Sequence, residues 1–358
     1  MIESAEIQNF RAFKFTQLSG LSRVNVVVGD NGVGKTALLE ALFLGAAPNP
    51  DVAVRFRVWR GADAPGATGT AQEISDGLFQ DLFFNMTKDV VPTIDLHGTA
   101  NDSRSLRLYY DASEPTLLSL VDQSQRQSSA YTPVTFEWKD AEGQITKLTP
   151  RVQAGGLAIP PITPLTHDPA FIAARAAFPT LQNARWFSDF SKRGRETKFI
   201  SALQAQFDYL KSLTVEVDLG SPVLFVKVPW LDSKMPIYLA SDGLNKLMTL
   251  LLHIAHSEHT AVFVDEIENG FHYGRYGKLW EQLLSFAEEY ETQLFISTHS
   301  WEFLKAGAPL IEKFHDDFSL IQVFQENGIS DAVVVPGRSA GAAIAAGIDV
   351  RPSRRNDD

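Results

Sequence analysis

One glycine-rich segment, residues 29–36, constrains the fold more than any other part of the chain. It reads Gly-Asp-Asn-Gly-Val-Gly-Lys-Thr and matches the pattern G-x-x-x-x-G-K-[S/T] at every fixed position. A β-branched run at 24–28 precedes it, and apolar residues with helical spacing follow at 38–43. A strand, a glycine loop and a helix in this order aim backbone N–H groups at phosphate oxygens. The alternative, a glycine-rich turn without a ligand, does not explain why both flanks also fit.

Within this segment two side chains have expected roles. Lys35 would neutralise the β- and γ-phosphates of ATP, and the Thr36 hydroxyl would hold Mg²⁺. We expect the nucleotide to contact the loop and the helix start, at Asn31, Gly32, Val33, Gly34, Lys35, Thr36 and Ala37.

Two later strands end in residues that suit the same chemistry. The apolar run 261–264 is followed by Asp265 and Glu266, and the run 293–297 is followed closely by His299. At the end of a strand an aspartate can bind Mg²⁺, and the next carboxylate can accept a proton from the attacking water. Adjacent carboxylates are otherwise common at helix caps and surfaces, and a lone histidine is commonly structural. The order of loop, acidic pair and histidine favours the functional interpretation.

A fourth piece lies upstream of the acidic pair. Ser241 and Gly243 open a long apolar helix predicted over 243–256. Taken alone, this is the pattern of a serine-capped helix start.

These four pieces, in this order, resemble the ABC-class ATPases of the SMC/RecF/OLD branch. The resemblance implies that Asp265 and Thr36 coordinate Mg²⁺ and that Glu266 is the catalytic base. Lys35 would also be catalytic, by stabilising the charge on the phosphates, and His299 would sense the γ-phosphate. It further implies that Ser241 and Gly243 cap the ATP of an opposite protomer, with Asn269 at that seam and Arg11 near the nucleotide. The pattern departs from the family at Asp242 and Lys246, where glycine and arginine are common, and Gln80 is our only candidate for the glutamine of the Q-loop.

Composition narrows the function classes. The 358 residues are 44% hydrophobic with a formal net charge of −11, which indicates a globular protein that does not coat nucleic acid by bulk charge. The absence of cysteine excludes disulfides, thiolate zinc sites and cysteine nucleophiles. No apolar run approaches the roughly 20 residues that cross a bilayer. We therefore expect a cytoplasmic protein without membrane contact.

We predict that the ATPase head is formed by two parts of the chain, separated by an insertion. The fold class we predict is α/β, a P-loop ABC-type ATPase head with a parallel core sheet, a β-rich insertion and a small helical lid. Residues 1–45 and 213–335 would form the head, 46–212 the insertion and lid, and 336–358 a tail with a small helix. Phe13 and Phe15 would lie on an edge strand, and alternation at 54–58, 106–110 and 134–138 predicts strands in the insertion.

The resemblance also implies partners. A short chain of this kind is similar to the stand-alone ATPase subunits of anti-phage systems such as PARIS or Septu, which control a separate nuclease or toxin. Too few residues follow His299 for an appended nuclease domain, and no heptads predict a coiled-coil arm. We expect a homo-oligomer, at least a dimer. The alternatives are a RecF-like DNA-repair ATPase and an ATP-binding scaffold with negligible turnover.

Two further clusters have open interpretations. Basic residues interleaved with aromatics at 185–198 suit nucleic-acid contact or a solvated helix face: Arg185, Lys192, Arg193, Arg195 and Lys198. His253, His256 and His259 have a spacing that invites a metal, but their spread around a helix favours a polar helix end.

Overall fold

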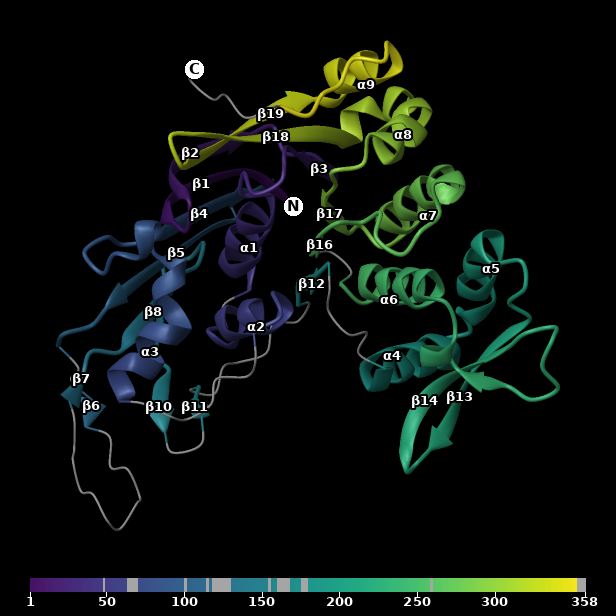
Figure 1. Cartoon of the computed structure of the whole chain (residues 1–358), viewed down its shortest axis with the longest axis horizontal. Coiled ribbons are helices and arrows are strands. Elements are labelled where there is room, and N and C mark those ends of the chain that lie inside the picture. Colours follow the sequence, from purple (N-terminus) through teal and green to yellow (C-terminus); the bar gives the residue numbers. More distant parts are fainter. Residues whose placement is uncertain are drawn as a thin grey trace.

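A large mixed sheet organises the molecule. The computed structural model describes residues 1–47, 49–62, 70–99, 102–113, 116–117, 130–153, 156–159, 168–174, 180–257 and 260–352. Within these residues the sheet has twelve strands (Figure 1). In spatial order they are β12 (Ala170–Ile172), β16 (Ala261–Val264), β17 (Gln293–Ser297), β3 (Val24–Val28), β18 (Phe318–Glu326), β19 (Ile329–Pro336), β2 (Phe13–Ser19), β1 (Ile2–Phe10), β4 (Thr93–Gly98), β5 (Ser103–Tyr110), β8 (Val134–Lys139) and β9 (Ile145–Leu148).

The first five strands of this order form a parallel core, as the sequence predicts. Neighbours from β12 to β18 all pair in parallel, and β16, β17 and β3 are buried along their whole length. Strands covered on both faces read as continuous apolar runs. On β16, Val262 and Val264 pack into one hydrophobic core and Phe263 into the other.

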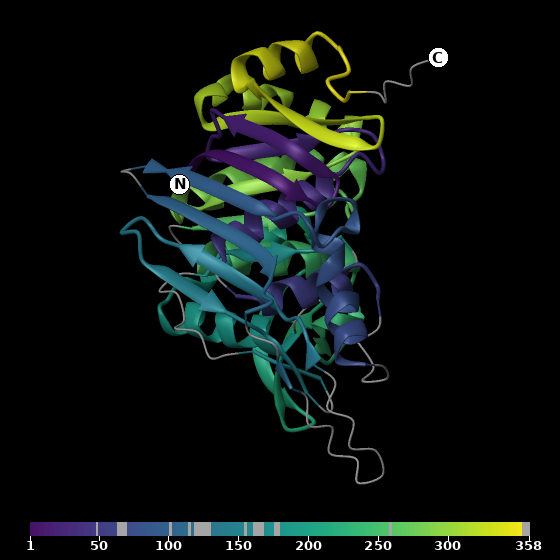
Figure 2. The ribbon, with the colours of Figure 1, turned by 90° about the vertical axis from the view of Figure 1, so that its left-hand side faces the viewer.

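Helices cover the two faces of this parallel core (Figure 1). The helices on one face are α1 (Lys35–Ala46) and α2 (Asp51–Trp59), and those on the other are α6 (Asp242–His256), α7 (Tyr276–Glu289), α8 (Trp301–Lys313) and α9 (Gly337–Ala345). The α3 helix (Ala71–Phe79) packs instead on the antiparallel strands, with Phe79 against Phe136 of β8. The remaining strands of the large sheet are antiparallel apart from the single pairing of β19 with β2, and they curve around α1 (Figure 2). The α1 helix is therefore buried on nearly every side.

Residues 180–236 form a smaller unit beside α6. Its helical part consists of two helices, separated at Gly194, which adopts φ +69°. A hairpin follows them and is extended by a third strand. The elements of this unit are α4 (Thr180–Lys192), α5 (Glu196–Gln206), β13 (Ser212–Asp218), β14 (Ser221–Lys227) and β15 (Met235–Pro236).

Two short strand pairs lie outside both the large sheet and this unit. They are β6 (Thr116–Leu117) with β7 (Ala130–Tyr131), and β10 (Arg151–Gln153) with β11 (Gly156–Ala158).

Two predictions were wrong. Residues 54–58 are not a strand but part of α2, because Val52, Ala53 and Phe56 have the helical spacing that buries one face. The strand containing Phe13 is not at an edge, since β2 lies between β1 and β19. The strands predicted at 106–110 and 134–138 are confirmed as parts of β5 and β8. In the part of the chain described, no helix is both long and apolar enough to span a bilayer.

Candidate nucleotide site

The glycine loop connects β3 to α1 through backbone that other residues would strain. Gly34, at φ +110°, is the N-terminal cap of α1, and a Cβ at Gly29 would lie 2.3 Å from the carbonyl oxygen of Val323. The Lys35 ammonium donates to the carbonyls of Gly29 and Asp30, both at 2.9 Å. Burial lowers the pKa of Lys35, while the carboxylates at 265 and 266 oppose this shift.

The glycine loop contacts the acidic strand end through hydrogen bonds to the Asp265 carboxylate. The Thr36 hydroxyl lies 3.0 and 3.1 Å from the two carboxylate oxygens of Asp265. The Ser297 hydroxyl donates to the same carboxylate at 2.6 Å. Burial raises the pKa of Asp265, and the hydrogen bonds from Ser297 and Thr36 oppose that shift. Carboxylate and hydroxyl oxygens are hard donors of the kind Mg²⁺ takes, so this pair fits a magnesium ion.

Glu266 is held from three directions. Its backbone is in the left-handed region at φ +48°, a conformation that costs of order 1–3 kcal/mol and tends to occur at functional sites. Its N–H donates to Ser297 at 2.8 Å, and its carbonyl accepts from the Lys246 ammonium at 2.7 Å. Asn269 donates to its carboxylate at 2.6 Å. Burial lowers the pKa of Lys246 to about 8.

Of these residues, Lys35, Thr36, Asp265 and Glu266 line one cavity of about 570 Å³, which we call the phosphate cavity. Val33 is not among its walls, because this side chain is buried; its carbonyl accepts from Ser330. Gln80 does not line it either, whereas the adjacent Asp81 does. The lining residues are Arg11, Ala12, Asn31, Gly32, Gly34, Lys35, Thr36, Ala37, Arg60, Asp81, Phe83, Asn85, Met86, Asp265, Glu266 and Gly328.

Sequence reasoning missed the arginine network on one wall of the cavity. Glu40 is buried on α1 and pairs with Arg60 through two hydrogen bonds of 2.9 and 2.6 Å. It also pairs with Arg11 at 2.9 Å, and Arg11 reaches Asp81 at 3.1 Å. Paired cations in this position suit a polyphosphate. The available signal was the acid at position 40, the one charge in the apolar part of α1 that follows Thr36.

His299 lies beside the cavity rather than in its wall. The buried carboxylate of Glu268 accepts from the backbone N–H groups of His299 at 2.9 Å and Ser300 at 3.1 Å, and lies 2.9 Å from the imidazole Nδ1 of His299. The His299 side chain is about half exposed. Glu268, which the sequence analysis did not single out, therefore positions the turn that carries this histidine.

Ser241 and Gly243 also lie outside the cavity lining. The Ser241 hydroxyl caps α6 by accepting from the N–H of Leu244, so the helix-cap interpretation is correct. A Cβ at Gly243 would lie 2.5 Å from the carbonyl oxygen of Gly270, so only glycine allows α6 to pack against the segment after Glu266.

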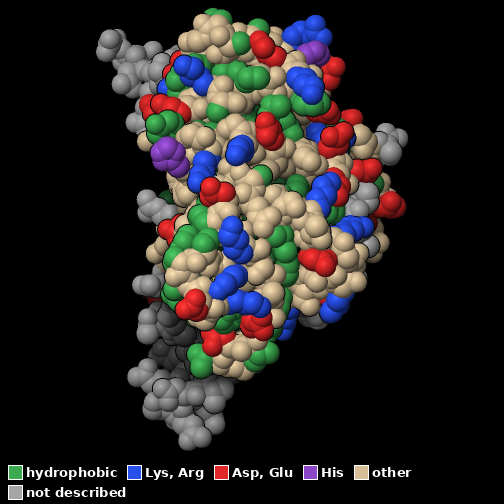
Figure 3. Space-filling view, turned by 90° about the vertical axis from the view of Figure 1, so that its right-hand side faces the viewer, with side chains coloured by type: hydrophobic (Ala, Val, Ile, Leu, Met, Phe, Trp, Pro, Cys, Tyr) green, Lys and Arg blue, Asp and Glu red, His purple; other side chains and the backbone are tan. Residues whose placement is uncertain are grey.

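The basic residues of α4 and α5 are exposed and mixed with acids (Figure 3). Lys192 pairs with Asp189, Lys198 pairs with Glu289, and the Arg195 guanidinium lies 6.0 Å from the ring centre of Tyr290. Among the described side chains, no group of three or more histidines and acids could hold a metal ion. His259 lies outside the described residues.

Comparison with known proteins finds two ATPase family models that match separate parts of the chain. A family model described as "AAA ATPase domain" matches residues 1–131. A second, "AAA domain, putative AbiEii toxin, Type IV TA system", matches residues 226–305. The first contains the glycine loop and the second contains Asp265 and Glu266. The α/β P-loop ATPase fold with a parallel core sheet is therefore confirmed.

Individual proteins add to this result. The ATP/GTP phosphatase of Helicobacter pylori is 23% identical over 333 residues, which cover 85% of this chain and 87% of that protein. The DNA replication and repair protein RecF of Idiomarina loihiensis is 46% identical over 43 residues, 12% of each chain. Together with the two family models, these sequence matches support an ATPase.

Solved structures with a similar arrangement of elements include two SMC heads. One, a SmcHead bound to the C-winged helix domain of ScpA, is 15% identical with a TM-score of 0.49 and covers 95% of this chain and 99% of that one. The other, the SMC head domain from Thermotoga maritima, is 14% identical with a TM-score of 0.43 and covers 94% and 98% of the two chains.

Proposed function

We propose that this chain binds Mg²⁺-ATP in the phosphate cavity and hydrolyses it. The observation that carries the proposal is the Thr36 hydroxyl within 3.1 Å of the Asp265 carboxylate, at the point where the glycine loop meets the acidic strand end. Bound Mg²⁺ would offset the negative charge of the phosphates and orient them. Thr36 and Asp265 would hold that ion.

The chain's own residues supply the remaining roles. Lys35 and the N–H groups of the loop would bind the β- and γ-phosphates, with Arg11 and Arg60 on the opposite wall. Glu266 would accept a proton from the attacking water, and Asn269 holds its carboxylate in place. His299, fixed by Glu268, would contact the γ-phosphate from the cavity edge.

A second copy of the chain would complete the site. Ser241 and Gly243 do not reach the phosphate cavity of their own chain, and the apolar side chains near them are exposed. Tyr238 is 51% and Leu239 is 65% exposed, and Met86 on the cavity wall is 63% exposed. Apolar groups exposed at both halves favour burial against another copy. We propose a dimer in which Ser241 of each copy faces the partner's ATP.

The output of this ATPase would be control of a separate effector, a nuclease or toxin, as in anti-phage systems. The match of residues 226–305 to a model named for a toxin system favours this assignment. A RecF-like role in DNA repair is the second candidate, favoured by the short match to RecF. An ATP-dependent gain in affinity for gapped duplex DNA would support the second candidate over the first.

Glu266→Gln tests the chemistry. This variant keeps a hydrogen-bonding side chain but cannot take a proton, so steady-state ATP hydrolysis should fall by roughly 100-fold or more while ATP still binds. Glu281→Gln, an exposed acid on α7, is the matched control. Hydrolysis at the wild-type rate in the Glu266 variant would remove this residue from the role of base. A wild-type protein that binds ATP without turnover would instead be the scaffold considered above.

Cysteine cross-linking tests the dimer, since the chain has no native cysteine. With Met86→Cys and Leu239→Cys on the Glu266→Gln background, ATP should produce a cross-linked dimer with a short bis-maleimide. The pair Met86→Cys and Ile145→Cys, whose second position is exposed on β9, is the control. Equal cross-linking of both pairs, or none with ATP, would contradict the proposed interface.

A further inference from the structure

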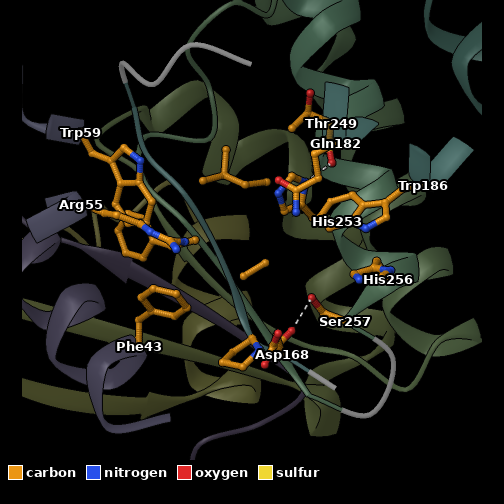
Figure 4. A pocket seen from close by; sticks show the side chains of 14 residues that line it. Phe43, Arg55, Trp59, Asp168, Gln182, Trp186, Thr249, His253, His256 and Ser257 are labelled. Carbon is orange, nitrogen blue, oxygen red and sulfur yellow. Dashed lines mark hydrogen bonds between the residues drawn. The ribbon is translucent and has the colours of Figure 1, made fainter. Parts of the chain in front are cut away.

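A second cavity, of about 370 Å³, lies beside β12, the last strand of the sheet in the described residues, and we call it the aromatic cavity (Figure 4). Its walls come from α1, α2, the segment containing β12, α4 and α6. Its lining residues include Trp59, Phe171, Gln182, Trp186, His253 and His256. It is separate from the phosphate cavity, because the two share no lining residue.

Flat rings form two opposite walls of this cavity. Trp59 stacks on Phe171 with ring centres 5.1 Å apart and planes 5° apart. Across the cavity, Trp186 stacks on His256 at 4.2 Å and meets the ring of His253 edge-on at 4.7 Å. Figure 4 shows Trp59 on one side and Trp186, His253 and His256 on the other. Walls of this kind suit a planar, polarisable ligand.

One buried polar group of the aromatic cavity is a hydrogen-bond acceptor. His253 is 7% exposed, and its Nδ1 lies 2.7 Å from the carbonyl oxygen of Thr249. A carbonyl can only accept, so Nδ1 carries the proton and Nε2 is left with a lone pair. Burial lowers the pKa of His253 to about 4, which keeps the ring neutral near pH 7. The exposed Gln182 amide can both donate and accept at the mouth.

We propose that the aromatic cavity binds a nucleobase. A base has two flat faces for the ring walls, a ring or exocyclic N–H for the acceptor of His253, and further edge atoms for Gln182. The volume falls in the range of small-ligand cavities. The base would come from a free nucleoside or from an unpaired position of a nucleic acid, two sources that present the same chemistry.

The ligand would be sensed at the phosphate cavity, because the same elements reach both places. Trp59 lines the aromatic cavity and Arg60, the next residue, lines the phosphate cavity. Ile172 lines the aromatic cavity, and its carbonyl accepts from the N–H of Asp265 at 2.9 Å. An occupied cavity would therefore change the ATP turnover rate. This regulatory part rests on the proposed function, whereas base binding does not.

Calorimetric titration of the full-length Lys35→Ala variant tests binding, because that variant separates the aromatic cavity from the phosphate cavity. The probes are adenosine, guanosine, cytidine and uridine at up to 1 mM, and single-stranded trinucleotides of the same bases. At least one probe should bind, and Trp186→Ala and Gln182→Ala should each weaken it, the first by about tenfold or more as expected for a lost base stack. Trp230→Ala, which removes an exposed indole outside the cavity, should have no effect.

The outcomes separate the alternatives. Binding of nucleosides supports a free ligand, and binding of trinucleotides alone supports a nucleic acid. No binding by any probe, or binding that Trp186→Ala and Gln182→Ala leave unchanged, would overturn the proposal. A probe that binds without changing wild-type ATP turnover would overturn the regulatory part alone. Wild-type protein without ATPase activity would count against the proposed function, while the titration of Lys35→Ala would still decide base binding.

Discussion

The two cavities are built in opposite ways on shared elements. The phosphate cavity takes eight of its lining residues from two short stretches, residues 31–37 and 265–266, and it concentrates charge. The aromatic cavity takes its walls from residues between 43 and 257, and it concentrates rings. The first is built in large part from residues that are adjacent in the sequence. The other exists only once α2, α4 and α6 have packed around β12.

This difference sets how each cavity should respond to substitution. In the phosphate cavity, Lys35 and Asp265 are buried charges that attract each other, so removing one leaves the other less well compensated. In the aromatic cavity the contacts are stacked rings on separate walls, each of modest energy. We expect abrupt losses in the first cavity and graded losses in the second.

Lys35→Ala should have the largest effect. Removing the only ammonium that the loop folds around should weaken Mg²⁺-ATP binding by more than about 100-fold, as expected for a lost charge-assisted phosphate contact. Calorimetric titration with a non-hydrolysable ATP analogue measures the loss. Lys305→Ala, an exposed lysine on α8, and Trp186→Ala should both retain affinity. An affinity within threefold of wild type in Lys35→Ala would break the distinction between the two cavities.

Thr36→Val should have the next largest effect. Valine has the shape of threonine without the hydroxyl that meets Asp265, so Mg²⁺-dependent turnover should fall about 10- to 100-fold while the fold persists. Thr36→Ser, which restores the hydroxyl, should recover most of the rate. Steady-state ATPase assays across a Mg²⁺ titration give the comparison. Equal rates for the valine and serine variants would contradict a metal ligand at this position.

The contrast between the cavities also explains what could be predicted from the sequence. The glycine loop and the acidic pair were predictable because their chemistry is local, and β3, β16 and β17 because continuous apolar runs indicate buried strands. The roles assigned to these residues stay predictions. The position of Arg60 was not predictable, since it depends on how α2 packs against Glu40.

Local pattern failed where tertiary packing decides. The alternation at 54–58 predicted a strand, but α2 buries Phe56 against the rings of Phe43 and Phe171. The alternation at Phe13 and Phe15 predicted an edge strand. In the structure this strand also pairs with β19, at Phe13 and Ser330, and local sequence cannot predict a contact between residues so far apart in the chain. His253 and Trp186 lie far apart in the chain, so their contact likewise has no sequence signature.

The buried His253 makes the aromatic cavity sensitive to acid. Its pKa of about 4 lies below the ordinary value of about 6.5, so the unfolded chain binds the proton more readily. The stability it contributes is complete above pH 6.5 and is lost as the pH falls toward 4, about 2 kcal/mol of it by pH 5. The charged or titratable groups lining the same cavity are Arg55, Asp168 and His256.

Comparing wild type with His253→Asn isolates the pH-dependent contribution of His253 to the free energy of unfolding. Urea unfolding at pH 7.5 and pH 5.0 should show a smaller loss for the variant, because asparagine does not titrate. His97→Asn, which replaces an exposed histidine on β4, should behave as wild type. Identical losses in His253→Asn and wild type would contradict a buried neutral imidazole.

The smallest effect is expected at the basic residues next to the aromatic cavity. Arg193→Glu with Arg195→Glu reverses two charges at the junction of α4 and α5, the first of which carries Trp186. Exposed charges contribute little each, so single-stranded DNA binding should weaken only about three- to tenfold at physiological salt, with a smaller salt dependence. Arg104→Glu, exposed on β5, is the control for net charge.

Nucleoside binding should not change, because a nucleoside has no phosphate for these arginines. A loss of oligonucleotide binding with nucleoside binding intact would therefore indicate that a nucleic acid supplies the base, and no change in either would assign these arginines to a solvated helix face.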